Sequence, residues 1–139
     1  MRTAFTPKRV PMRQSFILSL MFLMTIAGYA QNWTPDAATI SKVESGIKPS
    51  DIPQQYLPGH RPVIAGYARY YFGYTANNHR MIRGELIMPF GSKMKSAGIY
   101  VVASEKEFPM IFGGGCAVIH VVYDVEAGHI VSLRCNGAD

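Results

Sequence analysis

The chain has 139 residues and a formal net charge of +5 at neutral pH. Four of its fourteen basic residues and none of its nine acidic residues lie in the first thirty positions, so the remaining 109 residues carry a net charge of only about +1. In that remainder the basic residues are scattered among the acidic ones, whereas a nucleic-acid binder presents a basic patch or stripe. We therefore expect no nucleic-acid partner.

Residues 1–30 have the three parts of a cleavable secretory signal peptide. Four basic residues come first, an uncharged apolar run follows from Phe16, and small residues at positions 28 and 30 form a cleavage site. The apolar run is fifteen residues long, whereas a helix needs roughly 20 to cross the hydrocarbon core of a membrane. We expect cleavage after Ala30 and one domain at 31–139, exported to the periplasm or secreted. Contact with the membrane would be transient.

The exported part is predicted to begin with one helix. Thr34 is the predicted N-cap, Pro35 suits the first helical position, and Asp36 complements the positive end of the helix dipole. Apolar residues then recur at three- and four-residue steps and form one stripe, which needs a sheet to pack on: Ala37, Ile40, Val43 and Ile47.

After a proline-rich linker at 48–62, the pattern changes to strands. Asparagines 77 and 78 tolerate the positive φ of a tight hairpin, and a second hairpin joins the last two strands. The fold class is therefore α+β: one N-terminal helix packed on a curved antiparallel sheet of about five strands, an order that cystatin-like and NTF2-like rolls share. The expected strands are 63–74, 80–88, 98–104, 116–124 and 129–135.

The two cysteines of the chain, Cys116 and Cys135, predict one disulfide. An exported chain folds in an oxidising compartment, and the expected register brings the two residues close together at the far end of the second hairpin. The alternative is that Cys116 is a nucleophile activated by His120 or His129, which requires a free thiol. The histidines and acids form no cluster with metal-ligand spacing, so we predict no metal and no cofactor.

The strand at 63–74 is the most aromatic segment of the chain. Its alternation places Tyr67, Arg69 and Tyr71 on one face and Tyr70, Phe72 and Tyr74 on the other. We expect one set to form the core under the helix. We expect a half-exposed binding face to carry Arg69, Tyr71 and Arg83, because tyrosine and arginine are favoured at interfaces. A solvated face with ordinary cross-strand pairs is the alternative.

A second candidate binding feature is the long loop at 105–115. It contains three consecutive glycines and the aromatic residues Phe108 and Phe112, which we expect to form an apolar binding tip. The alternative is that these side chains only close the open end of the sheet. The glycines lack the lysine and hydroxyl residue of a phosphate-binding loop.

Two short runs resemble a known group of proteins. The first is GGCAVIHVVYD at 114–124 with CNG at 135–137, and the second is ARYYFG at 68–73 followed by IRGE at 82–85. Together they resemble a group of small exported, mostly proteobacterial proteins of uncharacterised function, over roughly residues 33–137. The resemblance implies export and a single domain, and it supplies no catalytic residues.

These observations favour an exported binding or accessory module over an enzyme. The module would be an inhibitor or an envelope-associated protein, and its partner a protein or ligand of the cell envelope. The main alternative is a small periplasmic hydrolase with a pocket between helix and sheet. A structural subunit of an envelope assembly is a third hypothesis. The polar groups offered for the hydrolase are Arg69, Tyr70, His120 and Asp124.

Overall fold

The computed structural model describes residues 31–52, 63–92 and 94–137. The predicted signal peptide and most of the proline-rich linker lie outside these described residues. Within them, every helix is too short or too polar to cross a membrane.

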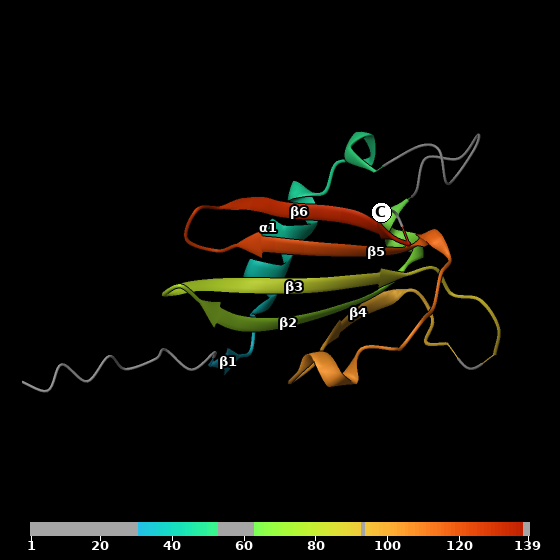
Figure 1. The fold of residues 1–139 in the computed structure, drawn as a ribbon, viewed down its shortest axis with the longest axis horizontal. Helices are drawn as coiled ribbons and strands as arrows, with labels where there is room; N and C mark the ends of the chain where they lie inside the picture. Colours follow the sequence, from blue (N-terminus) through green and yellow to red (C-terminus); the bar gives the residue numbers. More distant parts are fainter. Residues whose placement is uncertain (1–30, 53–62, 93, 138–139) are drawn as a thin grey trace, which may run out of the picture.

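Six strands form one sheet, shown in Figure 1. The order is β1-β2-β3-β5-β6, and β4 lies beside β1 on the outer edge of β2. Neighbouring strands are antiparallel except for β4, which runs parallel to β2. The strands are β1 (Asn32–Trp33), β2 (Ala68–Ala76), β3 (His79–Ile87), β4 (Gly98–Val101), β5 (Gly115–Asp124) and β6 (His129–Asn136).

The predicted α+β fold with one disulfide is confirmed, and the count of about five strands becomes six because residues 32–33 pair with β2. The segment expected to start the aromatic strand forms a short 3-10 helix, η3 (Ile64–Gly66), before β2 begins. Asn77 and Asn78 both have positive φ, 51° and 62°, as predicted for the β2–β3 hairpin.

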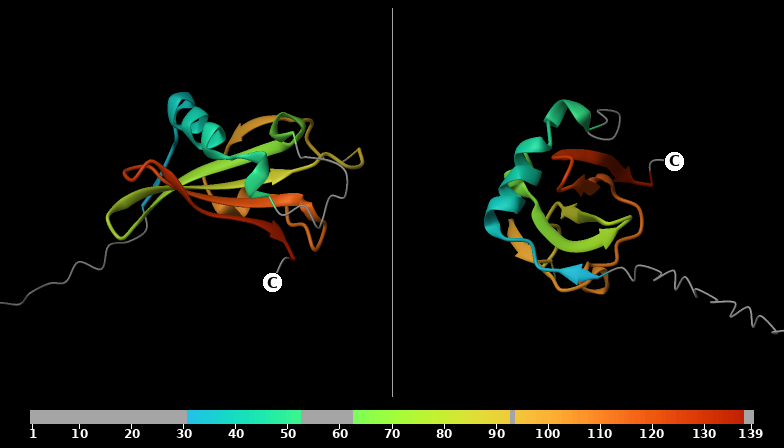
Figure 2. Two further views of the ribbon diagram at one scale, coloured as in Figure 1. Left: turned by 90° about the horizontal axis from the view of Figure 1, so that it is seen from above. Right: turned by 90° about the vertical axis from the view of Figure 1, so that its left-hand side faces the viewer.

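Helix α1 (Ala37–Gly46) lies across one face of the sheet, as Figure 2 shows. Its N-cap is Asp36, whose side chain accepts a hydrogen bond from the Thr39 N–H at 2.7 Å, so the helix begins two residues later than a Thr34 cap would place it. The apolar stripe is buried at Ile40 and Val43. A second short 3-10 helix, η1 (Pro49–Asp51), follows α1.

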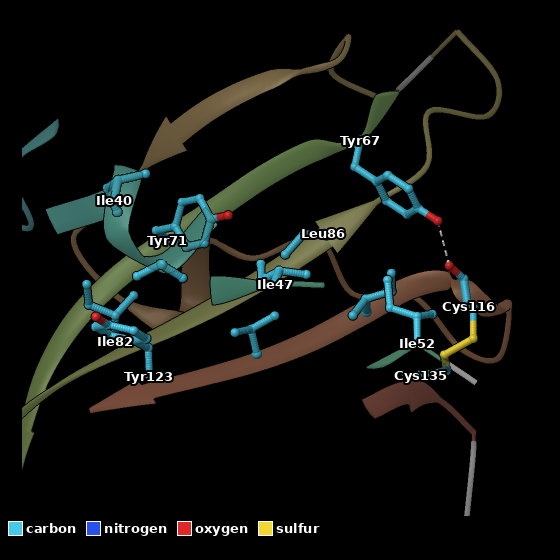
Figure 3. Packing of buried hydrophobic residues seen from close by; sticks show 13 residues of the cluster. Ile40, Ile47, Ile52, Tyr67, Tyr71, Ile82, Leu86, Cys116, Tyr123 and Cys135 are labelled. Carbon is cyan, nitrogen blue, oxygen red and sulfur yellow. Dashed lines mark hydrogen bonds between the residues drawn. A yellow bond between two sulfur atoms is a disulfide. The ribbon is translucent and has the colours of Figure 1, made fainter. Parts of the chain in front are cut away.

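The main core lies between α1 and the sheet (Figure 3). The disulfide closes one end of it: Cys116 and Cys135 are joined, both are buried, and their Cα atoms are 4.5 Å apart. The buried hydroxyl of Tyr67 donates to the Cys116 carbonyl at 2.9 Å. Apart from a bulge in β5 before Ile119, the sheet residues of this cluster lie an even number of positions apart along each strand, so they define the helix side of the sheet.

The opposite face of the sheet is partly covered by the segment that runs from β3 through β4 and the 3-10 helix η4 (Glu105–Glu107) to β5. Its apolar side chains pack on a second, smaller cluster in the sheet. The sheet residues of that cluster are Ala68, Tyr70, Ile87 and Val118, and the residues packed on them are Met94, Tyr100, Val102, Phe108 and Ile111. This segment leaves part of the face open, and the open part forms the candidate site.

Candidate functional site

The strand register places polar and aromatic side chains in rows on the face away from α1. Arg83 lies between Phe72 on β2 and Val122 on β5, and the next row holds Tyr70, Glu85 and His120. The residues between these rows, such as Tyr71 and Val121, belong to the core under the helix. Both rows therefore point to the side that the helix leaves uncovered.

A groove of about 530 Å³ lies over the first row. Its floor is apolar and aromatic, and its rim is polar and comes from η4 and the residue before it. We call this cavity the groove. It is lined by Asn32, Phe72, Tyr74, Arg83, Ser104, Glu105, Lys106 and Val122.

One ion pair crosses the groove from the sheet to η4. The Arg83 guanidinium contacts the carboxylate of Glu105, and both side chains are partly exposed. The sheet therefore contributes the cation and the covering segment the anion. Because the pair is exposed to solvent, its direct contribution to stability is small. Its position matters more, since it holds the Arg83 side chain against the covering segment.

Next to the groove is a smaller cavity of about 230 Å³, which we call the acidic pocket. It shares Glu105 with the groove and has Glu85 in its lining. Glu85 is only 7% exposed and makes no hydrogen bond or ion pair with another described residue. Burial raises the pKa of this carboxyl, Arg83 opposes that rise, and Glu105 adds to it. The apolar walls are Phe108, Pro109, Met110 and Ile111.

His120 lies across from Glu85 and is tied to the covering segment through Asn136. The Asn136 amide nitrogen donates to the carbonyls of Ile111 at 3.0 Å and Gly113 at 2.7 Å, so its oxygen is free to accept from His120 Nε2 at 3.4 Å. His120 Nδ1 is buried without a hydrogen-bond partner among the described residues. Burial lowers the pKa of His120, and the hydrogen bond to Asn136 opposes that shift.

The predicted grouping of Arg69, Tyr71 and Arg83 on one binding face is wrong. Arg69 and Tyr71 lie under the helix, where Arg69 Nε pairs with the Glu44 carboxylate at 2.8 Å and the Tyr71 hydroxyl donates to it at 3.3 Å. Tyr71 is 0% exposed. The alternation along β2 was predicted correctly, but the helix covers the tyrosine–arginine side rather than the side of Tyr70.

The loop at 105–115 divides its apolar residues between two roles. Phe108 packs against Tyr70 and Phe72, with ring centroids 6.3 Å and 5.5 Å away, and so closes the open end of the sheet. Phe112 is 89% exposed and lies outside both the groove and the acidic pocket. The three glycines that follow all have positive φ, a conformation that suits glycine.

The four polar groups offered for a hydrolase do not meet. Arg69 lies under the helix, Tyr70 and His120 lie on the opposite face, and Asp124 lies at a hairpin tip. A pocket of about 280 Å³ does exist between α1 and β4. Its one ionisable residue is Glu44, whose carboxylate is already held by Arg69 and Tyr71. Both cysteines are in the disulfide, so neither thiol is free to act as a nucleophile.

One group of potential metal ligands occurs among the described residues, at the tips of the two hairpins. The ligand atoms of His79, Asp124 and Glu126 lie within 4.8 Å of one another. Their carboxylate oxygens already accept hydrogen bonds from the protein: Asp124 from the Ala127 N–H, and Glu126 from the N–H and Nε of Arg80. These hydrogen bonds join the two hairpin tips, and they explain without a metal ion why the three residues lie close together.

No protein-family model, curated protein or solved structure matches the chain. The cystatin-like or NTF2-like comparison and the resemblance to small exported proteins therefore stay predictions.

Proposed function

We propose that the protein is an exported binding module whose ligand occupies the groove on the sheet face away from α1. The observation that carries this proposal is the groove itself: an apolar and aromatic floor with a few polar groups at its rim, which is the usual composition of a ligand site. Two of the polar groups, Arg83 on β3 and Glu105 on η4, are joined by an ion pair. This gives them fixed positions before any ligand arrives.

The proposed location is the periplasm or the extracellular space. The predicted signal peptide and the resemblance to small exported proteins support it, and the disulfide is compatible with an oxidising compartment. In this setting the module would serve as an inhibitor or an accessory protein of the cell envelope. An enzyme is the weaker hypothesis, because Arg69 on the helix side and Asp124 at a hairpin tip both lie apart from Tyr70 and His120.

Nuclear magnetic resonance with the ¹⁵N-labelled protein tests the groove. A set of small aromatic and alkyl compounds bearing cationic, anionic or neutral groups is added, and amide shifts are followed. We expect the shifts to cluster at Phe72, Tyr74, Arg83 and Val122. Shifts confined to other parts of the molecule, or none for any compound, would remove the groove as the binding site.

A pair of matched variants strengthens this test. Val122→Arg places a large charged side chain in the groove, whereas Val131→Arg makes the same change at a valine that is 55% exposed and outside it. Binding should be lost in the first variant and retained in the second. Equal binding by the Val122→Arg variant and the unmodified protein would contradict the proposal.

A further inference from the structure

The acidic pocket beside the groove holds more negative than positive charge. Arg83 neutralises Glu105, but no described residue pairs with Glu85. Arg83 is two positions from Glu85 on the same face of β3, yet its guanidinium is held by Glu105. A buried carboxylate without a partner is costly in its ionised form. A proton, or a cation supplied from outside the chain, would lower this cost.

The walls of the pocket restrict which cation fits. The lining combines two carboxylates with apolar side chains, among them Phe108, Ile111 and the exposed Met110. A metal ion such as Ca²⁺ takes six to eight oxygen ligands, which two carboxylates do not provide. A primary ammonium on an apolar stem satisfies both parts of the pocket. Aromatic rings next to it already hold an ammonium, since Lys95 Nζ lies 4.4 Å from the centroid of the Tyr100 ring.

Resting on the function proposed above, we propose that the acidic pocket binds a primary ammonium group on a short apolar stem, with Glu85 and Glu105 as its carboxylate partners. The stem lies against the apolar wall, on the side of the pocket where Glu105 also borders the groove. A free amine and the lysine side chain of a peptide both offer this chemistry.

Binding of the ammonium is coupled to the ionisation of Glu85. Burial raises the pKa of this carboxyl, and the cation binds its ionised form, so binding competes with protonation of Glu85. The affinity for the ammonium therefore rises with pH through the range in which Glu85 titrates. The charged or titratable groups around Glu85 are Tyr70 on β2, Arg83 on β3, His120 on β5, Glu105 on η4, and Lys95, whose Nζ lies over the Tyr70 ring.

Two variants should change the affinity in opposite directions. Glu85→Gln keeps the size of the side chain and removes the charge, so it should weaken ammonium binding by at least about tenfold. Arg83→Met removes the cation that competes for the carboxylates and should strengthen ammonium binding. Arg83 also lines the groove, so a groove that recognised only apolar surface would gain affinity for charged and uncharged probes alike in the Arg83 variant. A gain confined to the charged probe therefore tests the proposal even if the Glu85 variant folds poorly.

Calorimetry with the purified protein at neutral pH provides the test. The probes are 2-phenylethylamine and 2-phenylethanol, which share a stem and differ in charge, together with Nα-acetyl-lysine amide for the peptide source. We expect the amine to bind at least about tenfold more tightly than the alcohol. Tighter binding of the lysine amide than of 2-phenylethylamine would assign the site to a peptide, and the reverse order to a free amine.

The outcomes separate the two proposals. Equal affinity for the amine and the alcohol, unchanged by Glu85→Gln, would overturn the ammonium site and leave the groove as a binding site. Absence of binding by every probe, together with absence of any amide shift in the groove, would overturn both.

Discussion

Glu85 on β3 and His120 on β5 are cross-strand neighbours, and burial shifts the pKa of each toward its uncharged form: upward for the carboxyl and downward for the imidazole. Burial thus acts on two neighbouring groups on the face away from α1, and it disfavours the charged form of each. Neither group is paired with an opposite charge among the described residues. The free energy of unfolding should therefore depend on pH, and substitution of one group at a time shows how much of that dependence each group contributes.

Glu85→Gln should become more stabilising as the pH rises. The pKa of Glu85 is higher in the folded protein than its ordinary value of 4.5, so above that value the folded state holds more protons than the unfolded state. The free energy of unfolding then falls as the pH rises through the raised pKa. The amide that replaces the carboxyl cannot ionise, so the variant escapes this loss. Urea denaturation of the variant and the unmodified protein, from acid to neutral pH, measures the two free energies of unfolding. If the difference between them stayed constant with pH, the prediction would be contradicted.

Asp124 should show the opposite dependence. Hydrogen bonds from the Ala127 N–H and from His79 lower the pKa of this carboxyl below its ordinary value of 3.8. Its stabilising contribution is therefore present above 3.8 and is lost as the pH falls through the lowered pKa. Asp124→Asn should destabilise the protein at neutral pH and have little effect in strong acid. Asp51→Asn, at an exposed position, is the control and should change little at either pH.

Loss of the disulfide should lower the free energy of unfolding by about 3 kcal/mol, because the loop it closes spans 19 positions. The double variant Cys116→Ser, Cys135→Ser tests this by urea denaturation. A reducing agent should destabilise the unmodified protein by a similar amount and leave the double variant unchanged. If the reducing agent also lowered the free energy of unfolding of the double variant, its effect on the unmodified protein could not be assigned to the disulfide.

Gly73→Ala should detach β1 from the sheet. A Cβ atom at this position would lie 2.5 Å from the Trp33 ring and 2.6 Å from its backbone oxygen, so Trp33 must move. We expect a loss of about 1–3 kcal/mol. Trp33 is the only tryptophan of the chain, so its fluorescence should shift to the red as the ring becomes exposed. Gly66→Ala is the control, since a Cβ there has no neighbour within 4 Å.

Local patterns were sufficient to predict the main elements of the fold. The apolar stripe identified α1, paired asparagines identified the β2–β3 turn, and the two cysteines identified the disulfide. Two features depend on long-range contacts and were missed. The covalent order of the chain does not reveal that β4 lies parallel to β2 on its outer edge. It also gives no signal that the two residues of β1 join the same edge.

The candidate site could be predicted only in part, because its position also depends on long-range contacts. Alternation sorts the residues of β2 into two sets, but it does not say which set faces the helix. The sequence therefore predicts Tyr71 on an exposed binding face, although the Tyr71 side chain is buried under the helix. Glu85 is buried because the covering segment at 105–111 lies over it, and local patterns do not predict such a long-range contact. A bulge between Gly115 and Ile119 interrupts the alternation of β5, so Cys116 lies on the helix side whereas His120 faces away.

The most direct test of the ammonium site is the titration of the Glu85 side-chain carboxyl by ¹³C nuclear magnetic resonance, without and with 2-phenylethylamine. Without the amine, the midpoint should lie above the ordinary value of 4.5, and the amine should move it to lower pH because the cation favours the ionised carboxylate. A titration midpoint at or below 4.5 that the amine does not move would contradict the proposed ammonium site.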